Sequence, residues 1–257
     1  MIIGGAFLIG DDTDDGVAGV ITRALDVRGD DCYARREFDA AERYYDQVIE
    51  RGHDTTNEIV WSSVIGAASG KAKVMSVRRQ DDAALAFIDL WLKETVERFP
   101  AGPGHFGRLL TARISILVAD SRWVELVVVA DEVLERFGAA DDADVRWAVA
   151  QGLIEKATAI ERLGRPLDER LAAYEAIVER AEDVLPVIGW KLAVHNRPAA
   201  WVAHQKLLRA TLLSQLDRSE ESAHAYEQLI REFEGSDDAE IQLLIAAARA
   251  ALESDDE

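Results

Sequence analysis

One short phrase recurs along the chain and limits the folds open to it. It ends in a Glu-Arg or Arg-Glu pair that follows two adjacent aliphatic residues. The phrase occupies residues 45–51, 130–136, 174–180 and 226–232, and a weaker copy ends at residues 96–100. The pairs begin at positions 50, 97, 135, 179 and 231, so they are separated by 47, 38, 44 and 52 residues. A period of this size is typical of a repeat with one helix–turn–helix unit.

A polar break and an earlier apolar stretch precede each copy of the phrase. The breaks are residues 35–38, 78–81, 120–122, 163–166 and 216–219. We therefore expect first helices near 17–34, 57–77, 105–119, 144–163 and 199–216. Second helices are expected near 38–51, 81–99, 122–137, 167–184 and 219–234, and a last helix near 237–253. With only 5 prolines in 257 residues, the composition favours helix over sheet.

Helical periodicity and end signals agree with these ranges. Val149, Leu153, Ala157 and Ile160 recur at the spacing of one helical face. Pro166 and Ser219 lie at expected helix starts, where a missing N–H is tolerated or a cap is needed. Glycines at 52, 138 and 235 follow expected second helices, so we expect them to end those helices in the left-handed conformation.

The pattern resembles the tetratricopeptide-repeat family. That family places a Gly on the first helix and a small residue, an aromatic residue and another small residue on the second. In the first unit the matching residues are Gly29, Ala41, Tyr45 and, in place of the usual Ala, Val48. In the last unit they are Ala210, Ser222, Tyr226 and Leu229, and the fourth unit looks like a variant of the repeat. The second and third units match poorly.

The resemblance implies an all-α fold, a right-handed α-solenoid of about five antiparallel helix pairs with a C-terminal capping helix. We expect one such domain over residues 1–257. Its parts would be an N-terminal segment (1–16), four helix pairs (17–182), an irregular insertion (183–200), and the last pair with its cap (201–257). The insertion is either an extended loop or kinked helix between repeats, or a specialised contact element, because Trp190 and Trp201 flank it.

Charge and hydropathy bear on partners and location. The net charge is −19, from 48 acidic residues against 29 Lys and Arg, which disfavours nucleic acid as a partner. No apolar run is long enough to cross a membrane. The apolar residues 1–10 lack a preceding Lys or Arg and a cleavage site, so we interpret them as a packed segment rather than a signal peptide. A cytoplasmic location follows by default.

The chain offers no convincing catalytic, cofactor or metal site. Residues 11–16 resemble a calcium loop, but the bidentate Glu that completes such a loop is missing. The five histidines have no metal-ligand spacing, and we expect them at surface or cap positions. Cys32 is expected to be a small buried residue. Trp147 and Trp201 begin equivalent first helices, which indicates packing rather than ligand stacking.

In the resembled family the first helix of each pair lines a concave, peptide-binding face. The resemblance therefore implies a non-enzymatic scaffold that binds a protein or peptide and needs no cofactor; the face could equally be merely solvated. An alternative is a structural subunit that forms homo-oligomers, favoured if Ile241, Leu244, Ile245 and Ala248 of the terminal helix are exposed. A small-ligand sensor or enzyme is a further alternative. The residues assigned to the binding face are Arg23, Asp26, Asp30, Tyr33, Arg108, Thr111, Ser115, Gln151, Glu155, Thr158, Arg162, His204, Leu207 and Thr211.

Overall fold

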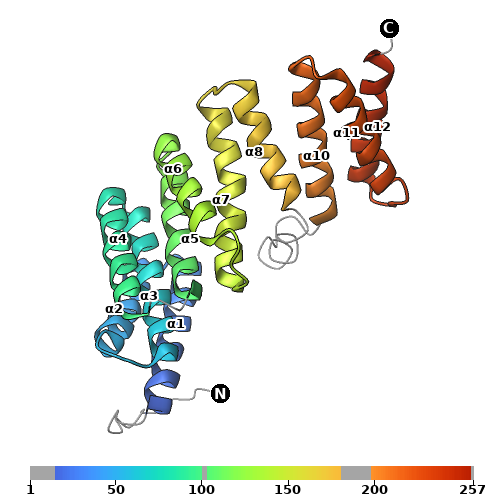
Figure 1. Ribbon diagram of the computed structural model, residues 1–257. Coiled ribbons are helices and arrows are strands. Elements are labelled where there is room, and N and C mark those ends of the chain that lie inside the picture. The colour runs from blue at the N-terminus through green and yellow to red at the C-terminus, as the bar shows by residue number, and fades with distance from the viewer. Residues whose placement is uncertain (1–14, 100–102, 181–197, 256–257) are drawn as a thin grey trace. The chain divides into compact units, whose positions relative to one another are not determined.

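A computed structural model describes residues 15–99, 103–180 and 198–255 (Figure 1), and every regular element among these residues is an α-helix. The all-α expectation is therefore confirmed. The expected segments 1–16 and 183–200 lie almost wholly outside the described residues. The helices are α1 (Asp15–Ala34), α2 (Phe38–Gly52), α3 (Glu58–Val77), α4 (Asp81–Arg98), α5 (Pro103–Ala119), α6 (Trp123–Phe137), α7 (Ala143–Arg162), α8 (Leu167–Glu179), α10 (Pro198–Gln215), α11 (Ser219–Phe233) and α12 (Ala239–Asp255).

The chain divides into two compact units, residues 1–116 and 117–257. In the first, α1 packs on α2 and on α3, and α3 packs on both α2 and α4. Its core is made of large side chains that are fully buried, among them Tyr45 of α2, Trp61 and Ile65 of α3, and Ile88 of α4. Each helix thus buries a face against its neighbours in sequence, as in a helical repeat.

In the second unit, α7 packs on α6 and α8, α10 on α8 and α11, and α12 on both α10 and α11. Trp147, Ile154 and Trp201 pack around the buried Ala150, which agrees with the packing role expected for the two tryptophans. In α12, Ile241, Ile245 and Ala248 are buried, so the exposed strip that would have favoured self-association through this helix is not present.

The same turn ends five helices, and it defines the repeat more sharply than the Glu-Arg phrase. A residue with left-handed backbone follows α1, α3, α5, α7 and α10 at Arg36, Arg79, Ser121, Gly164 and Asp217. At each turn the N–H of the residue after the left-handed one donates to the carbonyl five residues before it, as from Glu37 to Cys32 and from Gln80 to Met75. This is the Schellman motif. The left-handed residues recur after 43, 42 and 43 residues and then after 53, an interval that spans the undescribed residues 181–197.

The glycines expected to take the left-handed conformation do not do so. Gly138 has φ −57°, and among the described glycines only Gly164 has a positive φ. Gly52 and Gly138 are instead needed for space. A Cβ on Gly52 would lie 2.4 Å from Val64 Cγ2, and one on Gly138 would lie 2.5 Å from the Leu134 carbonyl oxygen. That prediction was wrong because a glycine at a helix end can serve either a left-handed backbone or a close contact, and the sequence alone does not distinguish the two.

Cysteine and histidine burial gives one confirmation and one correction. Cys32 is buried, as expected. His105 is buried too, although surface or cap positions were expected for the histidines, and its ring centroid lies 5.7 Å from that of Phe99. No helix within the described ranges has the length and apolarity that a bilayer crossing requires.

Candidate binding site

The repeated turn supplies a register for the residues assigned to the binding face. Counted back from the left-handed residue of each turn, Arg108, Thr111 and Ser115 of α5 are equivalent to Arg23, Asp26 and Asp30 of α1, as expected. His204, Leu207 and Thr211 of α10 keep their expected places in the same way. In α7, Gln151 and Thr158 also keep theirs, whereas Ile154 and Glu161 take the places assigned to Glu155 and Arg162.

The register also identifies face residues of α3, for which the sequence pattern predicted none. They are Gly66, Ser69, Lys73 and Ser76. The copy of the Glu-Arg phrase in this unit is the weaker one, so it could not be used to align α3 with the other first helices. A usable signal was nevertheless present, because the Arg-Arg doublets 35–36 and 78–79 mark the same turn.

Asp26 is the residue around which the face of the first unit is organised. It is only 8% exposed, and its Oδ1 is buried without a hydrogen-bond partner in the described part of the chain. A Cβ on Gly66 of α3 would lie 2.7 Å from Asp26 Oδ2 and 2.9 Å from Arg108 Nη1. The carboxyl group and the guanidinium of α5 therefore both lie against bare backbone of α3. We call Arg23, Asp26, Asp30, Gly66 and Arg108 the Asp26 cluster.

Burial and charge act in opposite directions on Asp26. Burial, which disfavours the charged form, and the negative charge of Asp30 raise its pKa to about 7. The positive charges of Arg108 and Arg23 lower the pKa but do not restore its ordinary value. Near neutral pH the carboxyl group is therefore divided between its protonated and ionised forms.

Asp30, one helical turn further along α1, is hydrogen-bonded by Tyr45, the residue at the aromatic position of the repeat. Tyr45 of α2 donates its hydroxyl to Asp30 Oδ1 over 2.9 Å, and the buried ring needs glycine on both neighbouring helices. A Cβ on Gly29 would lie 2.5 Å from Tyr45 Cε1, and one on Gly70 would lie 2.3 Å from Cζ. Burial and the Asp30 charge raise the pKa of Tyr45, so its hydroxyl stays protonated and remains a donor.

The rest of the assigned face in this unit is polar. Thr111 Oγ1, one turn along α5 from Arg108, is buried and has no hydrogen-bond partner within the described ranges. The Ser115 hydroxyl donates to the Thr111 carbonyl over 2.8 Å, which satisfies it within the helix. Tyr33 is partly buried, and burial raises its pKa. Arg23 and Arg108 are exposed.

In the second unit, hydroxyl groups of two assigned residues are bonded within the protein. The Thr158 and Thr211 hydroxyls donate to carbonyls of their own helices, and Tyr226 donates to Thr211 over 3.2 Å. Burial raises the pKa of Glu155. Arg162 and His204 are exposed. None of these groups is a buried carboxylate with an unpartnered oxygen, so the first unit offers the stronger site.

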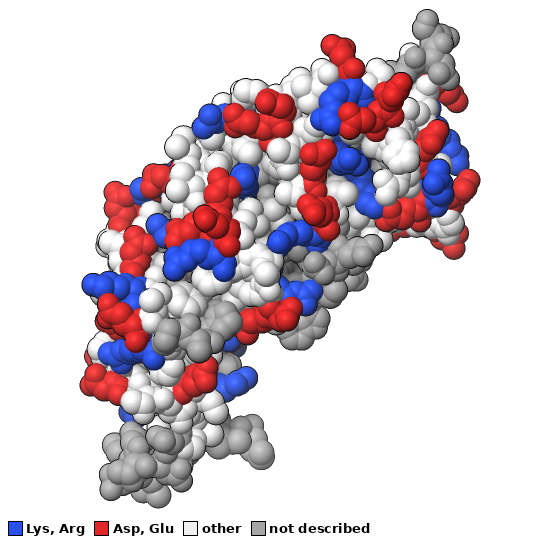
Figure 2. All heavy atoms as spheres, viewed as in Figure 1, with Lys and Arg blue, Asp and Glu red and all other residues white. Residues whose placement is uncertain are grey.

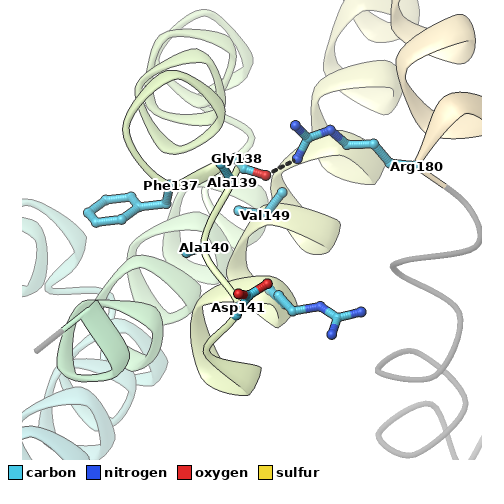
Figure 3. A pocket seen from close by; sticks show the side chains of 8 residues that line it. Phe137, Gly138, Ala139, Ala140, Asp141, Val149 and Arg180 are labelled. Carbon is cyan, nitrogen blue, oxygen red and sulfur yellow. Dashed lines mark hydrogen bonds between the residues drawn. The ribbon is translucent and has the colours of Figure 1, made fainter.

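Two small cavities carry no candidate chemistry. One of about 170 Å³ lies in the second unit beside the turn after α6, where Arg180 donates to the Gly138 carbonyl over 2.5 Å (Figure 3). The other, of about 280 Å³, lies among α1, the end of α2 and the start of α3, and is lined by residues such as Thr22 and Glu50. The Thr22 hydroxyl is already bonded to carbonyls of its own helix, so this cavity presents little that could direct a reaction.

Charges on the surface are mixed. On the face seen in Figure 2, Lys and Arg alternate with Asp and Glu, without a broad basic area. Many pairs join neighbouring helices, such as Lys71 with Asp46 at 2.5 Å and Arg113 with Asp89 at 3.4 Å. Within the described ranges, no three His, Cys, Asp or Glu side chains converge as metal ligands would. The suspected calcium loop lies mostly outside those ranges.

Comparison with known proteins adds no assignment. No family model matches the chain, and no curated protein or solved structure matches it either. The resemblance to tetratricopeptide repeats therefore stays a prediction, supported by repeat-like packing of the helices and by the recurring turn.

Proposed function

We propose that this protein is a non-enzymatic scaffold that binds a protein or peptide across the first helices of its repeats, with the Asp26 cluster as the main contact. One observation carries the proposal: Asp26 is only 8% exposed, and one of its carboxyl oxygens is buried with no hydrogen-bond partner among the described residues. Leaving a buried acceptor unsatisfied costs roughly 1–3 kcal/mol, and a bound donor would recover that cost.

The surroundings of Asp26 favour binding over catalysis. An enzyme site needs an acid, base or nucleophile positioned around a reacting atom. The Asp26 cluster offers two carboxyl groups and two guanidinium groups, of which those of Asp26 and Arg108 lie against Gly66, and such a set suits recognition of polar groups. A cytoplasmic location and a divergent tetratricopeptide-like solenoid are parts of the same proposal.

The proposal is tested by panning a random peptide library against the whole protein and then mapping the recovered peptides by hydrogen exchange. We expect bound peptide to slow exchange in α1, α3 and α5 more than in α2 and α4. Failure to recover any peptide that binds in solution would contradict the proposal. Protection confined to α2, α4 and α6 would contradict it as well.

Self-association is a second candidate, favoured by three valines on α1. Val17, Val20 and Val27 are 44%, 69% and 59% exposed and lie on the side of the helix turned away from the buried Thr22 and Asp26. Light scattering over a wide concentration range tests this function. A dimer that dissociates in the variant Val20→Asp would support it, and a monomer at every concentration would exclude it.

A further inference from the structure

Two carboxyl groups of the Asp26 cluster lie one helical turn apart on α1. Asp26 and Asp30 are four residues apart, a spacing at which side chains are neighbours on the helix surface. The two groups repel one another. Tyr45 supplies a donor to Asp30 Oδ1, whereas Asp26 Oδ1 has no hydrogen-bond partner from the residues that the structure describes. The feature that is missing from this arrangement is a donor, preferably one with a positive charge.

The groups packed around Asp26 do not supply that donor. On α1, Arg23 and Asp30 act on it with opposite charges; α2 contributes Tyr45, which is committed to Asp30. From α3 the nearest residue is Gly66, which has no side chain. From α5, Arg108 lies beside Gly66, and its charge compensates only in part for burial and for Asp30.

We propose that Asp26 and Asp30 together bind a lysine or arginine side chain of a peptide partner, which reaches the cluster at the exposed Asp30. This inference rests on the proposed function and specifies the chemistry of its ligand. An ammonium or guanidinium group has several N–H donors, so it can bond to the exposed Asp30 carboxylate and, once a rotation of the Asp26 side chain uncovers the buried Oδ1, to Asp26 as well. Its charge removes the repulsion between the two acids. The net charge of −19 attracts a basic peptide over longer distances.

The proposal has a pH signature. A cation binds the ionised form of Asp26, whereas part of the population is protonated below a pKa of about 7. Binding should therefore strengthen as the pH rises from about 6 to about 8 and level off above that range. The ordinary pKa values of lysine and arginine lie far above this window, so the peptide does not change charge within it.

The experiment uses lysine- or arginine-containing peptides recovered by panning the wild-type protein. Each is compared with a version in which norleucine replaces lysine, or citrulline replaces arginine, one position at a time. Calorimetry then measures the affinity of each peptide for the wild type, for Asp26→Asn and for Asp31→Asn. Asp31 is the matched control because it carries the same charge on α1 but pairs with Arg35 at 3.1 Å.

We expect one basic residue of the peptide to account for about a tenfold or greater loss of affinity, in the peptide analogue and in Asp26→Asn alike. The two losses should not add when combined, and Asp26→Asn should abolish the pH dependence while Asp31→Asn retains it. Peptides that map to α1, α3 and α5 but contain no required basic residue would overturn this inference and leave the proposed function standing. Peptides that map elsewhere would overturn both.

Discussion

The raised pKa of Asp26 predicts how the stability of the protein without a ligand changes with pH. In the unfolded chain an aspartate titrates near pH ~3.9, whereas burial and Asp30 raise the pKa of Asp26 to about 7 in the folded protein. Between these values the folded state binds more protons, so the contribution of Asp26 to stability falls as the pH rises and is lowest above about pH 7. The variant Asp26→Asn removes this titration.

We therefore expect Asp26→Asn to be more stable than the wild type at about pH 8, with the advantage shrinking toward about pH 4, by an amount of the order of a few kcal/mol. Urea unfolding followed by circular dichroism at several pH values measures it. Asp31→Asn, which loses the same charge from a more exposed position, should show no such trend. A stability difference that is constant with pH would show that Asp26 titrates normally.

Gly70 provides a second test at the scale of one residue. A Cβ there would lie 2.3 Å from Cζ of the fully buried Tyr45, which has no room to move. We expect Gly70→Ala to destabilise the protein by about 1–3 kcal/mol, as overpacking does in other cores. Gly235→Ala is the control, since nothing lies within 4 Å of its Cβ position. Equal stability of the two variants would contradict the described packing of Tyr45.

Among the elements, the helix ends show what sequence could and could not predict. Apolar periodicity and polar breaks placed all eleven described helices within a few residues of their bounds. The backbone of the turns was not predictable, because Arg36, Arg79, Ser121 and Asp217 adopt a conformation that usually indicates glycine. Their hydrogen bonds hold them there although their side chains disfavour it.

That conflict predicts a stabilising substitution. Arg79 has φ 62°, and a left-handed conformation costs a non-glycine residue roughly 1–2 kcal/mol. We expect Arg79→Gly to raise stability by up to about 1 kcal/mol, after allowing for the greater freedom of glycine in the unfolded chain. The converse variant, Gly164→Ala, should lower stability because Gly164 has φ 60°, which alanine disfavours. Open space around the Cβ position means that a steric clash does not add to this effect. Thermal unfolding of both variants checks the pair; two changes of the same sign would contradict the argument.

Burial of Asp26 could not be predicted from the sequence for a different reason. Its position on the face followed from the resemblance, but its environment depends on Gly66 of α3 and Arg108 of α5, which are 40 and 82 residues away along the chain. The period-43 register that relates these helices emerges only when the turns are aligned. Periodicity within one helix predicts which of its faces is buried. The site also depends on how α1, α3 and α5 pack together, which that periodicity does not predict.

At the scale of the whole molecule, the division into residues 1–116 and 117–257 predicts local unfolding. Helices of a repeat array contact their neighbours in sequence, so a perturbation should fade with distance along the chain. We expect Gly70→Ala to speed hydrogen exchange in α1–α4 and to leave α10–α12 unchanged. The control Gly235→Ala should alter neither group of helices. Uniform acceleration over the whole chain would indicate a single cooperative unit instead.

The proposed function requires a partner to bind at the Asp26 cluster, and site-specific photo-cross-linking measures the position of binding directly. A benzoylphenylalanine replaces Arg23 or Arg108, exposed residues of the Asp26 cluster, and in matched controls replaces Ala24 or Glu50, exposed residues outside the cluster. We predict that a peptide recovered by panning forms adducts from positions 23 and 108, and that excess unlabelled peptide suppresses them. Adducts from positions 24 and 50, with none from 23 and 108, would contradict binding at the Asp26 cluster.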